Sequence, residues 1–471
     1  MVKLWGQDKG ADALAPLLLA PLLLATVLLA TVLLVAGCGT PPARSQSVPQ
    51  PPAASRSSAA SAASAASGRP AASGPQTAPG SQAAPGSQAA SGSPAASGSP
   101  AAAPIWLDSL QMTSASTGWA LRWTQNPAVV NDGYRAPART TDGARTWTSV
   151  TPPAARALLA TPGATVVLQA LDGERAWLAV TAAATDGSPT HLTDVFGTVN
   201  GGRTWTTSAP LKVSGYAALL SFAGPEHGWL LMADGVAMGQ EPVQLYRTSD
   251  AGLRWSLAAQ TPKAGAESTG LPAGCDKAAL AFATASVGYI SNACNLLSGA
   301  LLVSRDGGMN WAAQALPVPA TSCGDGCQVS GPQFAGQTGF LAIDRAPGAP
   351  NFLVSQDLGV SWRSEPLPSG AGEDPRIQFF SPLSGLLVSA GPQGVIGHLF
   401  YTTADGGQTW TAVPQGRSFT QLGTSFDFVS ARTGFAWSPG TDAQGSSPPA
   451  MYLTTDSGRT WVAFTPRLAP T

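Results

Sequence analysis

Short apolar and aromatic runs, separated by Gly, Pro and Asp, characterise the chain from residue 105 onward. Runs such as 243–246 (VQLY) and 301–303 (LLV) have the length of β-strands. Each leads into an eight-residue motif, Ser/Thr-x-Asp-x-Gly-x-Thr-Trp, of which Thr403–Trp410 is the fullest copy. Because an Asp side chain accepts hydrogen bonds from turn N–H groups and Gly tolerates positive φ, the motif predicts a β-hairpin turn whose Trp opens the returning strand.

The motif occurs seven times, and successive copies lie 48 to 58 residues apart, which is room for one four-stranded unit. Asn200 replaces the Asp in the second copy, and Ala144 replaces the Gly in the first, so we expect the first turn to be the most strained or altered. A residue that recurs in every repeat serves a shared fold, whereas a catalytic group is needed once. We therefore predict a structural role for Asp142 and Trp147, Asn200 and Trp205, Asp250 and Trp255, Asp306 and Trp311, Asp357 and Trp362, Asp405 and Trp410, and Asp456 and Trp461.

A second repeated feature, a small residue followed by an aromatic or apolar one, lies midway between these motifs and opens another strand. Its copies are Gly118-Trp119, Ala176-Trp177, Gly228-Trp229, Gly288-Tyr289, Gly339-Phe340, Gly385-Leu386 and Gly434-Phe435. Four antiparallel strands repeated seven times predict an all-β fold, a seven-bladed β-propeller over residues 105–471. The first and last repeats are as apolar as the others, which favours a closed ring over an open solenoid. The chain should begin at a first strand and end at a fourth, leaving no swapped strand to close the ring.

The N-terminal segment has the layout of a secretory signal. Lys3 and Lys9 precede an apolar run over residues 14–36 that ends in small residues. Residues 34–38 (LVAGC) resemble the lipobox of bacterial lipoproteins, which implies a signal peptide over 1–37, cleavage before Cys38 and lipidation of that residue. The alternative is an uncleaved transmembrane anchor. Either way we expect an extracytoplasmic protein, lipid-anchored to the bacterial cell membrane in the first case.

Residues 38–104 are almost wholly Ala, Ser, Pro, Gly and Gln after the cysteine. Such a segment has too little apolar surface to offset the entropy of ordering, so we predict a disordered tether.

Charge and cysteine content narrow the possible partners. Charged residues make up 11% of the chain and the net charge is −1. The chain therefore lacks the excess of positive charge that nucleic-acid binding requires, and we expect no nucleic-acid partner. Besides Cys38, an even number of cysteines remains, as expected of disulfides in an exported protein. Cys275 and Cys294 flank the first hairpin of the fourth repeat, so we predict that they pair, and Cys323 then pairs with Cys327. The three histidines are not at ligand spacing from these cysteines, so we expect no metal and no cofactor.

The eight-residue motif resembles the Asp-box, also called the bacterial neuraminidase repeat, over residues 105–471. Seven copies in one body look most like the photosystem II assembly and stability factor family, and more distantly like sortilin-type propellers. The resemblance implies a non-enzymatic binding or assembly platform with the Asp-boxes on the outer rim, away from ligand. It implies a protein partner, or a glycan, and we expect a monomer; nothing in the chain specifies a photosystem partner.

An enzymatic alternative is a glycoside hydrolase of sialidase type, because those enzymes share the Asp-box. They also carry an Arg-Ile-Pro motif near the start, whereas here Arg376-Ile377 comes late and is followed by Gln378. Glu373 and Asp374 are adjacent, so in a strand they would point to opposite faces and not form a catalytic pair. We predict no catalytic residues. A third reading is a purely structural cell-surface protein.

A ligand surface, if present, should be formed by the connections between blades and between second and third strands. The longest of these connections are 125–134, 182–191, 260–274 and 438–449. Tyr134 with Arg135, and Arg376 with Glu373 and Asp374, are the most distinctive side chains nearby. The alternative, that these are ordinary surface groups, stays open, and the ligand-binding residues are not identified by the sequence.

Overall fold

We analysed a computed structural model of the chain, which divides into two units, residues 1–93 and 94–471. The structure describes residues 105–125, 133–183, 191–213, 215–234, 242–262, 270–294, 300–318, 327–345, 351–372, 375–391, 397–419, 424–438 and 450–469. The predicted signal peptide, the predicted lipidation site Cys38 and the predicted tether lie outside these ranges.

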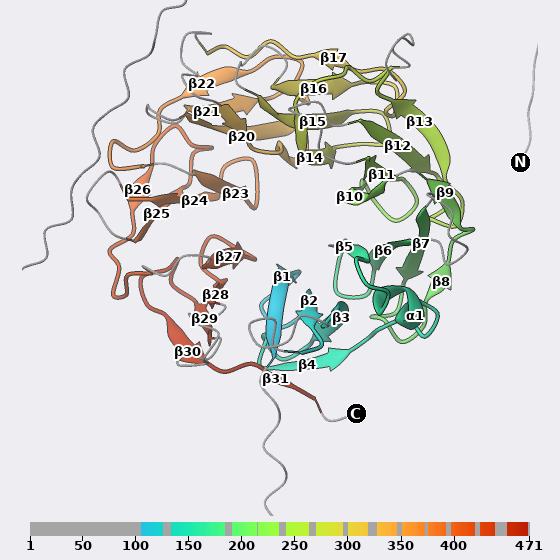
Figure 1. Ribbon diagram of the computed structural model, residues 1–471. Helices are drawn as coiled ribbons and strands as arrows, with labels where there is room; N and C mark the ends of the chain where they lie inside the picture. The colour runs from blue at the N-terminus through green and yellow to red at the C-terminus, as the bar shows by residue number, and fades with distance from the viewer. Residues whose placement is uncertain are drawn as a thin grey trace, which may run out of the picture. The chain divides into compact units, whose positions relative to one another are not determined.

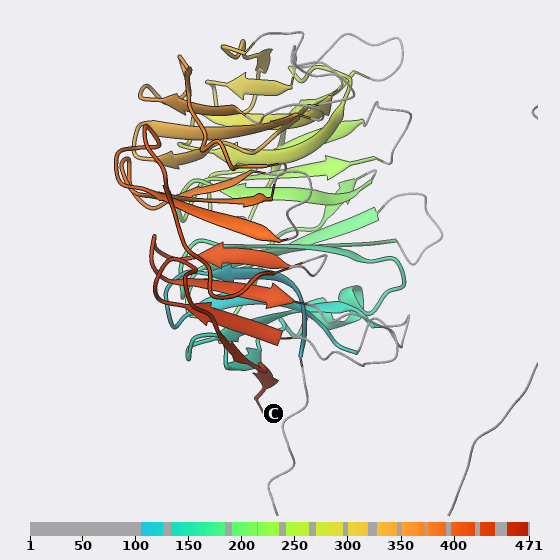
Figure 2. The ribbon, with the colours of Figure 1, turned by 90° about the vertical axis from the view of Figure 1, so that its left-hand side faces the viewer.

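The predicted seven-bladed β-propeller is confirmed, with antiparallel four-stranded blades arranged around a central opening (Figure 1). Figure 2 shows the blades from the side. The first three blades consist of β1 (Trp106–Met112), β2 (Gly118–Trp123), β3 (Arg135–Thr140) and β4 (Thr146–Ser149); β5 (Thr165–Ala170), β6 (Ala176–Ala183), β7 (His191–Thr198) and β8 (Thr206–Thr207); and β10 (Tyr216–Phe222), β11 (Gly228–Ala233), β12 (Val243–Thr248) and β13 (Ser256–Gln260).

The remaining blades follow the same order. They consist of β14 (Asp276–Phe282), β15 (Gly288–Cys294), β16 (Leu301–Ser304) and β17 (Ala312–Ala313); β18 (Cys327–Val329) with β19 (Gln333–Ala335), β20 (Thr338–Arg345), β21 (Asn351–Ser355) and β22 (Arg363–Glu365); β23 (Arg376–Phe379), β24 (Gly385–Ala390), β25 (His398–Thr403) and β26 (Thr411–Ala412); and β27 (Ser425–Phe428), β28 (Gly434–Ser438), β29 (Ala450–Thr454) and β30 (Val462–Phe464). In six blades the second strand begins at the pair of a small and an aromatic or apolar residue, called the small–aromatic pair below, and in the fifth it begins one residue earlier, at Thr338. In every blade the eight-residue motif, for which we use Asp-box as a label, joins the third strand to the fourth.

This order defines two faces of the ring. The turns between first and second strands and the Asp-box turns lie on one side, here called the hairpin face. The connections between second and third strands and from blade to blade lie on the other, here called the loop face. The first strands line the central opening (Figure 1).

The apolar core lies between blades, not within them. One buried cluster joins Trp229 and Leu245 of the third blade to Ile290 and Leu302 of the fourth. Another joins Trp147 of the first blade to Phe435 and other residues of the seventh. Because each blade buries both faces against its neighbours, the repeats are stable only as a ring.

Polar side chains on the innermost strands add a ring of hydrogen bonds, here called the inner belt. Each lies opposite the first apolar or aromatic residue of the second strand and accepts a hydrogen bond from a backbone N–H of the next blade's first strand, as Gln111 does from Ala170. The belt consists of Gln111, Gln169, Ser221, Gln333, Gln378 and Asp427. Ala281 occupies the position in the fourth blade. Asp427 accepts from Met112 and so joins the seventh blade to the first.

The prediction that no extra strand closes the ring is wrong. The strand β31 (Arg467–Leu468) pairs in parallel with β4, the outermost strand of the first blade. The N–H of Arg467 donates to Arg145 O at 2.9 Å, and that of Ala469 donates to Trp147 O at 2.8 Å. The otherwise open edge of the first blade is thereby covered, and a two-residue strand carries no alternation that a sequence pattern could reveal.

Three further elements were not predicted: the helix α1 (Ala155–Leu159), the strand β9 (Leu211–Val213) beside β7, and the division of the fifth blade's first strand. The first piece, β18, pairs with both β20 and the end of β15, so the fourth and fifth blades share one continuous sheet.

The cysteines lie around this junction. Cys275 is disulfide-bonded. The register pairs Asp276 with Ala293 and Cys294 with Cys327, which brings three cysteine-bearing backbone segments together. Cys323 lies outside the described residues, as do the side chains of Cys294 and Cys327. The pairing scheme therefore stays a prediction.

Candidate functional site

The Asp-boxes form hydrogen-bonded turns on the hairpin face. In the seventh copy Thr454 Oγ1 donates to Asp456 Oδ1 at 2.9 Å and accepts from the N–H of Gly458 at the same distance. Asp456 Oδ1 also accepts from the N–H of Thr460 at 2.8 Å, and Oδ2 accepts from its hydroxyl at 2.6 Å. With so many donors directed at the carboxylate, its oxygens serve the turn.

Hydrogen bonds keep these carboxyl groups ionised. The side-chain and backbone donors of Ser361 lower the pKa of Asp357 to about 2, and those of Thr409 do the same for Asp405. Asn200 preserves the turn with a neutral group: its Oδ1 accepts from Thr204 N–H at 2.9 Å and its Nδ2 donates to Thr204 Oγ1 at 2.7 Å. A turn that tolerates Asn needs an acceptor oxygen, not a charge.

The first box is strained, since Ala144 has φ 64° and is buried. Three other boxes also place a non-glycine residue at positive φ, here the residue directly after the box Asp. These residues are Ala251, Leu358 and Ser457. The sequence motif did not reveal this second left-handed position.

The box tryptophans differ in their partners. In four copies the indole N–H donates to the carbonyl three residues earlier, as Trp461 does to Gly458 at 2.9 Å. Trp205 instead donates to Val150 O of the preceding blade. The indole N–H groups of Trp362 and Trp410 are buried without a hydrogen-bond partner among the described residues.

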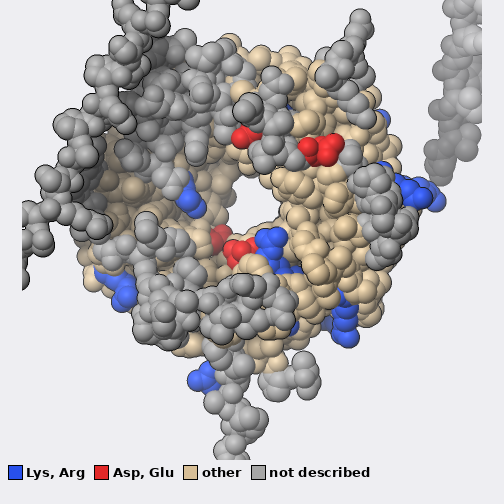
Figure 3. Space-filling view, viewed as in Figure 1, with Lys and Arg blue, Asp and Glu red and all other residues tan. Residues whose placement is uncertain are grey.

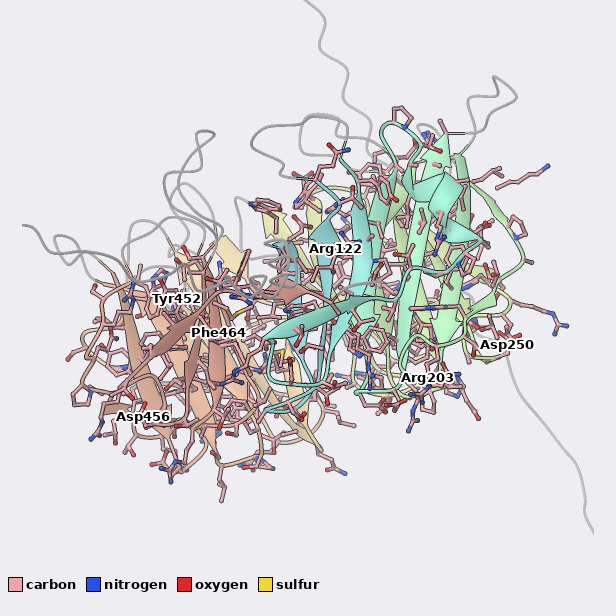
Figure 4. All side chains as sticks on the ribbon, turned by 90° about the horizontal axis from the view of Figure 1, so that it is seen from below. Arg122, Arg203, Asp250, Tyr452, Asp456 and Phe464 are labelled. Atoms are coloured by element: carbon pink, nitrogen blue, oxygen red, sulfur yellow. The ribbon has the colours of Figure 1, made fainter. Side chains whose placement is uncertain are left out.

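The boxes do not converge on one site. They occupy separate turns around the hairpin face, and Figure 4 shows Arg203, Asp250 and Asp456 on the side away from Arg122. Within the described ranges, no group of three or more His, Cys, Asp or Glu side chains could hold a metal ion. Glu373 and Asp374 lie outside those ranges, so their relation to Arg376 at the start of β23 stays a prediction.

A pocket on the loop face brings together residues of the first two blades. It is a cavity of about 460 Å³ lined by Trp123, Tyr134 and Arg135 on one side and by residues 159–164 on the other. We call it the Trp123–Tyr134 pocket. Trp123 ends β2 and Arg135 begins β3, and the backbone bond from Thr124 N–H to Tyr134 O, 2.9 Å, holds the two strand ends together.

The charged groups of the pocket are positioned by their neighbours. Arg135 forms an ion pair with Asp108 of β1, with 2.8 Å between Nη1 and Oδ2, and its guanidinium lies 5.9 Å from the Trp123 ring centre. Arg122, which precedes Trp123 but does not line the pocket, donates to Trp123 O at 3.4 Å; its Nε is buried without a partner among the described residues, and burial lowers its pKa. The pocket thus offers apolar surface beside one oriented cationic group, that of Arg135.

The sequence reasoning singled out Tyr134 and Arg135 but missed Trp123 and the wall built by the segment after α1. An available signal was Trp123 itself, an aromatic residue at the outer end of a predicted second strand. Figure 3 shows acidic and basic side chains near the central opening on this face, among mostly uncharged surface.

Comparisons with known proteins provide a structural context. No protein-family model matches the chain, and no curated protein matches it. Among solved structures, YCF48 bound to D1 peptide is 17% identical, with 72% of this chain and 91% of that chain covered and a TM-score of 0.43. YCF48 from Cyanidioschyzon merolae is 15% identical, with 78% and 97% covered and a TM-score of 0.45.

An enzyme is also among the similar structures. The GH74 xyloglucanase from Xanthomonas campestris is 14% identical, with 78% of this chain and 54% of that chain covered and a TM-score of 0.46. Peptide-bound and carbohydrate-active proteins therefore both occur among these structures. At such identities and TM-scores, neither likeness argues for a function of this chain.

No helix of the described part of the chain has the length and apolarity required to cross a bilayer.

Proposed function

We propose that this protein is an exported lipoprotein, anchored through Cys38, whose propeller is a non-enzymatic scaffold that binds a protein partner on its loop face. The Trp123–Tyr134 pocket is the observation that carries the proposal. Trp, Tyr and Arg are the residue types that contribute most to protein–protein binding energy, particularly where apolar surface and a positioned cation adjoin. Here all three line one cavity of about 460 Å³.

The pairing of Arg135 favours binding over catalysis. Its ion pair with Asp108 and its position near the Trp123 ring fix the guanidinium as a contact surface. A glycosidase needs two carboxyl groups on either side of a bond to be cleaved. Among the described residues that line this pocket none carries a carboxyl group, and the carboxylate of Asp108 is held in the ion pair with Arg135.

The test uses the full-length protein, extracted with detergent from membranes of its own organism. Bound proteins are identified by mass spectrometry, and their affinity is measured for the purified pair. Trp123→Ala combined with Tyr134→Ala should weaken saturable binding tenfold or more, about the loss expected for an interface hot spot. Leu383→Ala is the matched control, because Leu383 is 58% exposed in a turn of the hairpin face, and it should bind like the wild type.

Three outcomes would contradict the proposal in whole or in part. A partner that binds the double variant and the wild type equally would place the interface elsewhere. Hydrolysis of a fluorogenic sialoside or another glycoside by the wild type would replace the scaffold with the enzymatic alternative. Saturable binding to a glycan array, lost in the double variant, would keep the pocket but change the class of partner.

A further inference from the structure

Two grooves on the hairpin face are structurally equivalent, and one of them lacks the acidic group that the other has. One groove lies between the first and second blades and the other between the third and fourth. In the second and fourth blades, the backbone N–H of the residue after the box Asn or Asp donates to a carbonyl in the turn between the blade's first and second strands. These bonds run from Gly201 to Glu174 O, 2.8 Å, and from Gly307 to Ser286 O, 2.9 Å. Glu174 of the second blade and Ser286 of the fourth therefore occupy the same position.

An arginine crosses each groove from the preceding blade. Arg139 and Arg247 both stand directly before the hydroxyl residue that opens their Asp-box. Arg139 lies against Gly201, where an added Cβ would come within 2.7 Å of the guanidinium carbon. Arg247 reaches Gly307 in the same way, since an added Cβ there would lie 3.6 Å from Nη1. We call the two sites the blade 1–2 groove and the blade 3–4 groove.

The acidic partner distinguishes the two grooves. In the blade 1–2 groove Arg139 Nη2 donates to Glu174 Oε1 at 2.6 Å, and Arg203 Nη2 lies 3.3 Å from the other carboxylate oxygen. In the blade 3–4 groove Ser286 takes the place of Glu174, and the Arg247 guanidinium forms no hydrogen bond or ion pair with any described residue. The cavity there is larger, about 710 Å³ against about 510 Å³.

A second departure from the repeat adds charge to the same groove. The residue before the box Trp is elsewhere a Thr, Ser or Asn, whose side chain hydrogen-bonds the box carboxylate or amide, as Thr460 does with Asp456. In the third blade this residue is Arg254, which lines the groove and is 88% exposed. Its Nη1 lies 3.9 Å from Asp250 Oδ2, too far for a hydrogen bond. His227 also lines the groove.

We propose that the blade 3–4 groove binds an oxyanion, the carboxylate, sulfate or phosphate group of a ligand, between Arg247 and Arg254. Among the described residues that line the groove there are two arginines and one acid, Asp250, and hydrogen bonds from the Arg254 N–H and the Thr248 hydroxyl hold Asp250 in the box turn. Guanidinium groups bind oxyanions through two parallel hydrogen bonds, and such charge-assisted bonds are shorter and stronger than those between neutral groups. In the blade 1–2 groove the carboxylate of Glu174 already binds Arg139, as the oxyanion would bind Arg247 in the blade 3–4 groove.

The equivalence supplies the test. Ser286→Glu should provide Arg247 with an internal carboxylate. Glu174→Ser should free the Nη2 group of Arg139, while its Nε stays bonded to Gly173 O. Binding of inorganic sulfate, inorganic phosphate and glutarate to the full-length protein is measured by isothermal titration calorimetry at constant ionic strength. The wild type should bind at one saturable site, Ser286→Glu and Arg247→Gln should weaken binding about tenfold or more, and Glu174→Ser should gain a second site.

Controls separate the proposal from misfolding and from general charge effects. Each variant should keep the wild-type thermal midpoint in the absence of the anion; if Ser286→Glu does not fold, Arg254→Gln replaces it. Arg432→Gln removes a cation from a different turn of the hairpin face and should leave binding unchanged. Tighter binding of glutarate than of sulfate and phosphate would indicate that the natural ligand carries a carboxylate, as an acidic peptide or a sugar acid does. Tighter binding of sulfate or phosphate would indicate a sulfated or phosphorylated ligand. Equal binding by wild type, Ser286→Glu and Arg247→Gln would overturn the proposal.

Discussion

At the scale of single residues, Asp427 departs most from its equivalents in the inner belt. Four blades place Gln at this position and one places Ser, whereas the seventh blade has an ionisable group. Burial raises the pKa of Asp427 to about 6, despite the hydrogen bonds that it accepts from Met112 N–H and the Gln378 side chain. At neutral pH the burial of an ionised carboxylate at the junction of first and last blades costs free energy, which the hydrogen bond from Met112 offsets only in part.

This raised pKa predicts a pH dependence of stability. Because the folded protein holds the proton more tightly than the unfolded chain, Asp427 contributes most to stability below its ordinary pKa of 3.8, and the contribution is lost as pH rises through about 6. Asp427→Asn cannot ionise and should be more stable than the wild type at pH 7, by up to about 3 kcal/mol, with the difference vanishing near pH 4. Urea unfolding of both proteins between pH 4 and 7.5 measures the difference.

Comparing the two proteins at each pH removes the opposite contribution of the Asp-boxes. The lowered pKa of Asp357 and Asp405, about 2, stabilises the fold above pH 3.8 in both proteins, and this is lost as pH falls toward 2. A stability difference between wild type and variant that stays constant from pH 4 to 7.5 would contradict the assignment.

At the scale of elements, the Asp-box hairpin holds the third and fourth strands of each blade together. Asp456→Ala should remove the acceptor for Thr454 Oγ1 and for the N–H and hydroxyl of Thr460, and lower the free energy of unfolding by roughly 1–3 kcal/mol. Asp456→Asn should cost less than half as much, because Asn200 makes the equivalent bonds in the second blade. Urea unfolding measures both, and equal losses would show that charge matters more than the acceptor oxygen.

The same elements show what the sequence could predict. Seven box tryptophans and seven small–aromatic pairs mark strand starts, so the blade count and the strand order were predictable. The helix α1 and the strand β31 were not, because five-residue and two-residue elements carry too few positions to display a period. The division between β18 and β19 depends on pairing with a neighbouring blade, which no local pattern contains.

The candidate sites were predictable only in part. Tyr134 and Arg135 stand out in the sequence, but Trp123 joins them only because the hairpin of β2 and β3 brings both strand ends to one pocket. The blade 3–4 groove has a local signal in the sequence, because Arg254 takes the Thr position of its box. The absence of an acid at Ser286 becomes apparent only when the blades are superposed and Ser286 is compared with Glu174. Arg247 and Ser286 belong to different repeats, so no local pattern relates them.

At the scale of the whole molecule, stability depends on closing the ring between the first and last blades. Three contacts join these two blades at different distances from the ring axis. Nearest the axis, Asp427 accepts a hydrogen bond from Met112 in the inner belt, and Trp437 Nε1 donates to Leu107 O at 3.1 Å. At the outer edge, β31 pairs with β4. Trp147, buried beneath this edge, packs in the core cluster that contains Phe435 and Trp437 of the seventh blade. The outer contact therefore protects apolar surface shared by both blades.

Removing residues 466–471 should open this junction from the outside. The truncated protein loses the hydrogen bonds of Arg467 and Ala469 to the backbone of the first blade and exposes the edge at Trp147, which together should cost about 2–4 kcal/mol. Hydrogen exchange followed by mass spectrometry should then accelerate in β4 and β30 before other blades, because a ring that opens at one junction exposes the blades beside it first. Removal of residues 470–471 alone, beyond β31, is the matched control. Uniform acceleration around the ring, or none, would show that β31 is not what keeps the first and seventh blades closed.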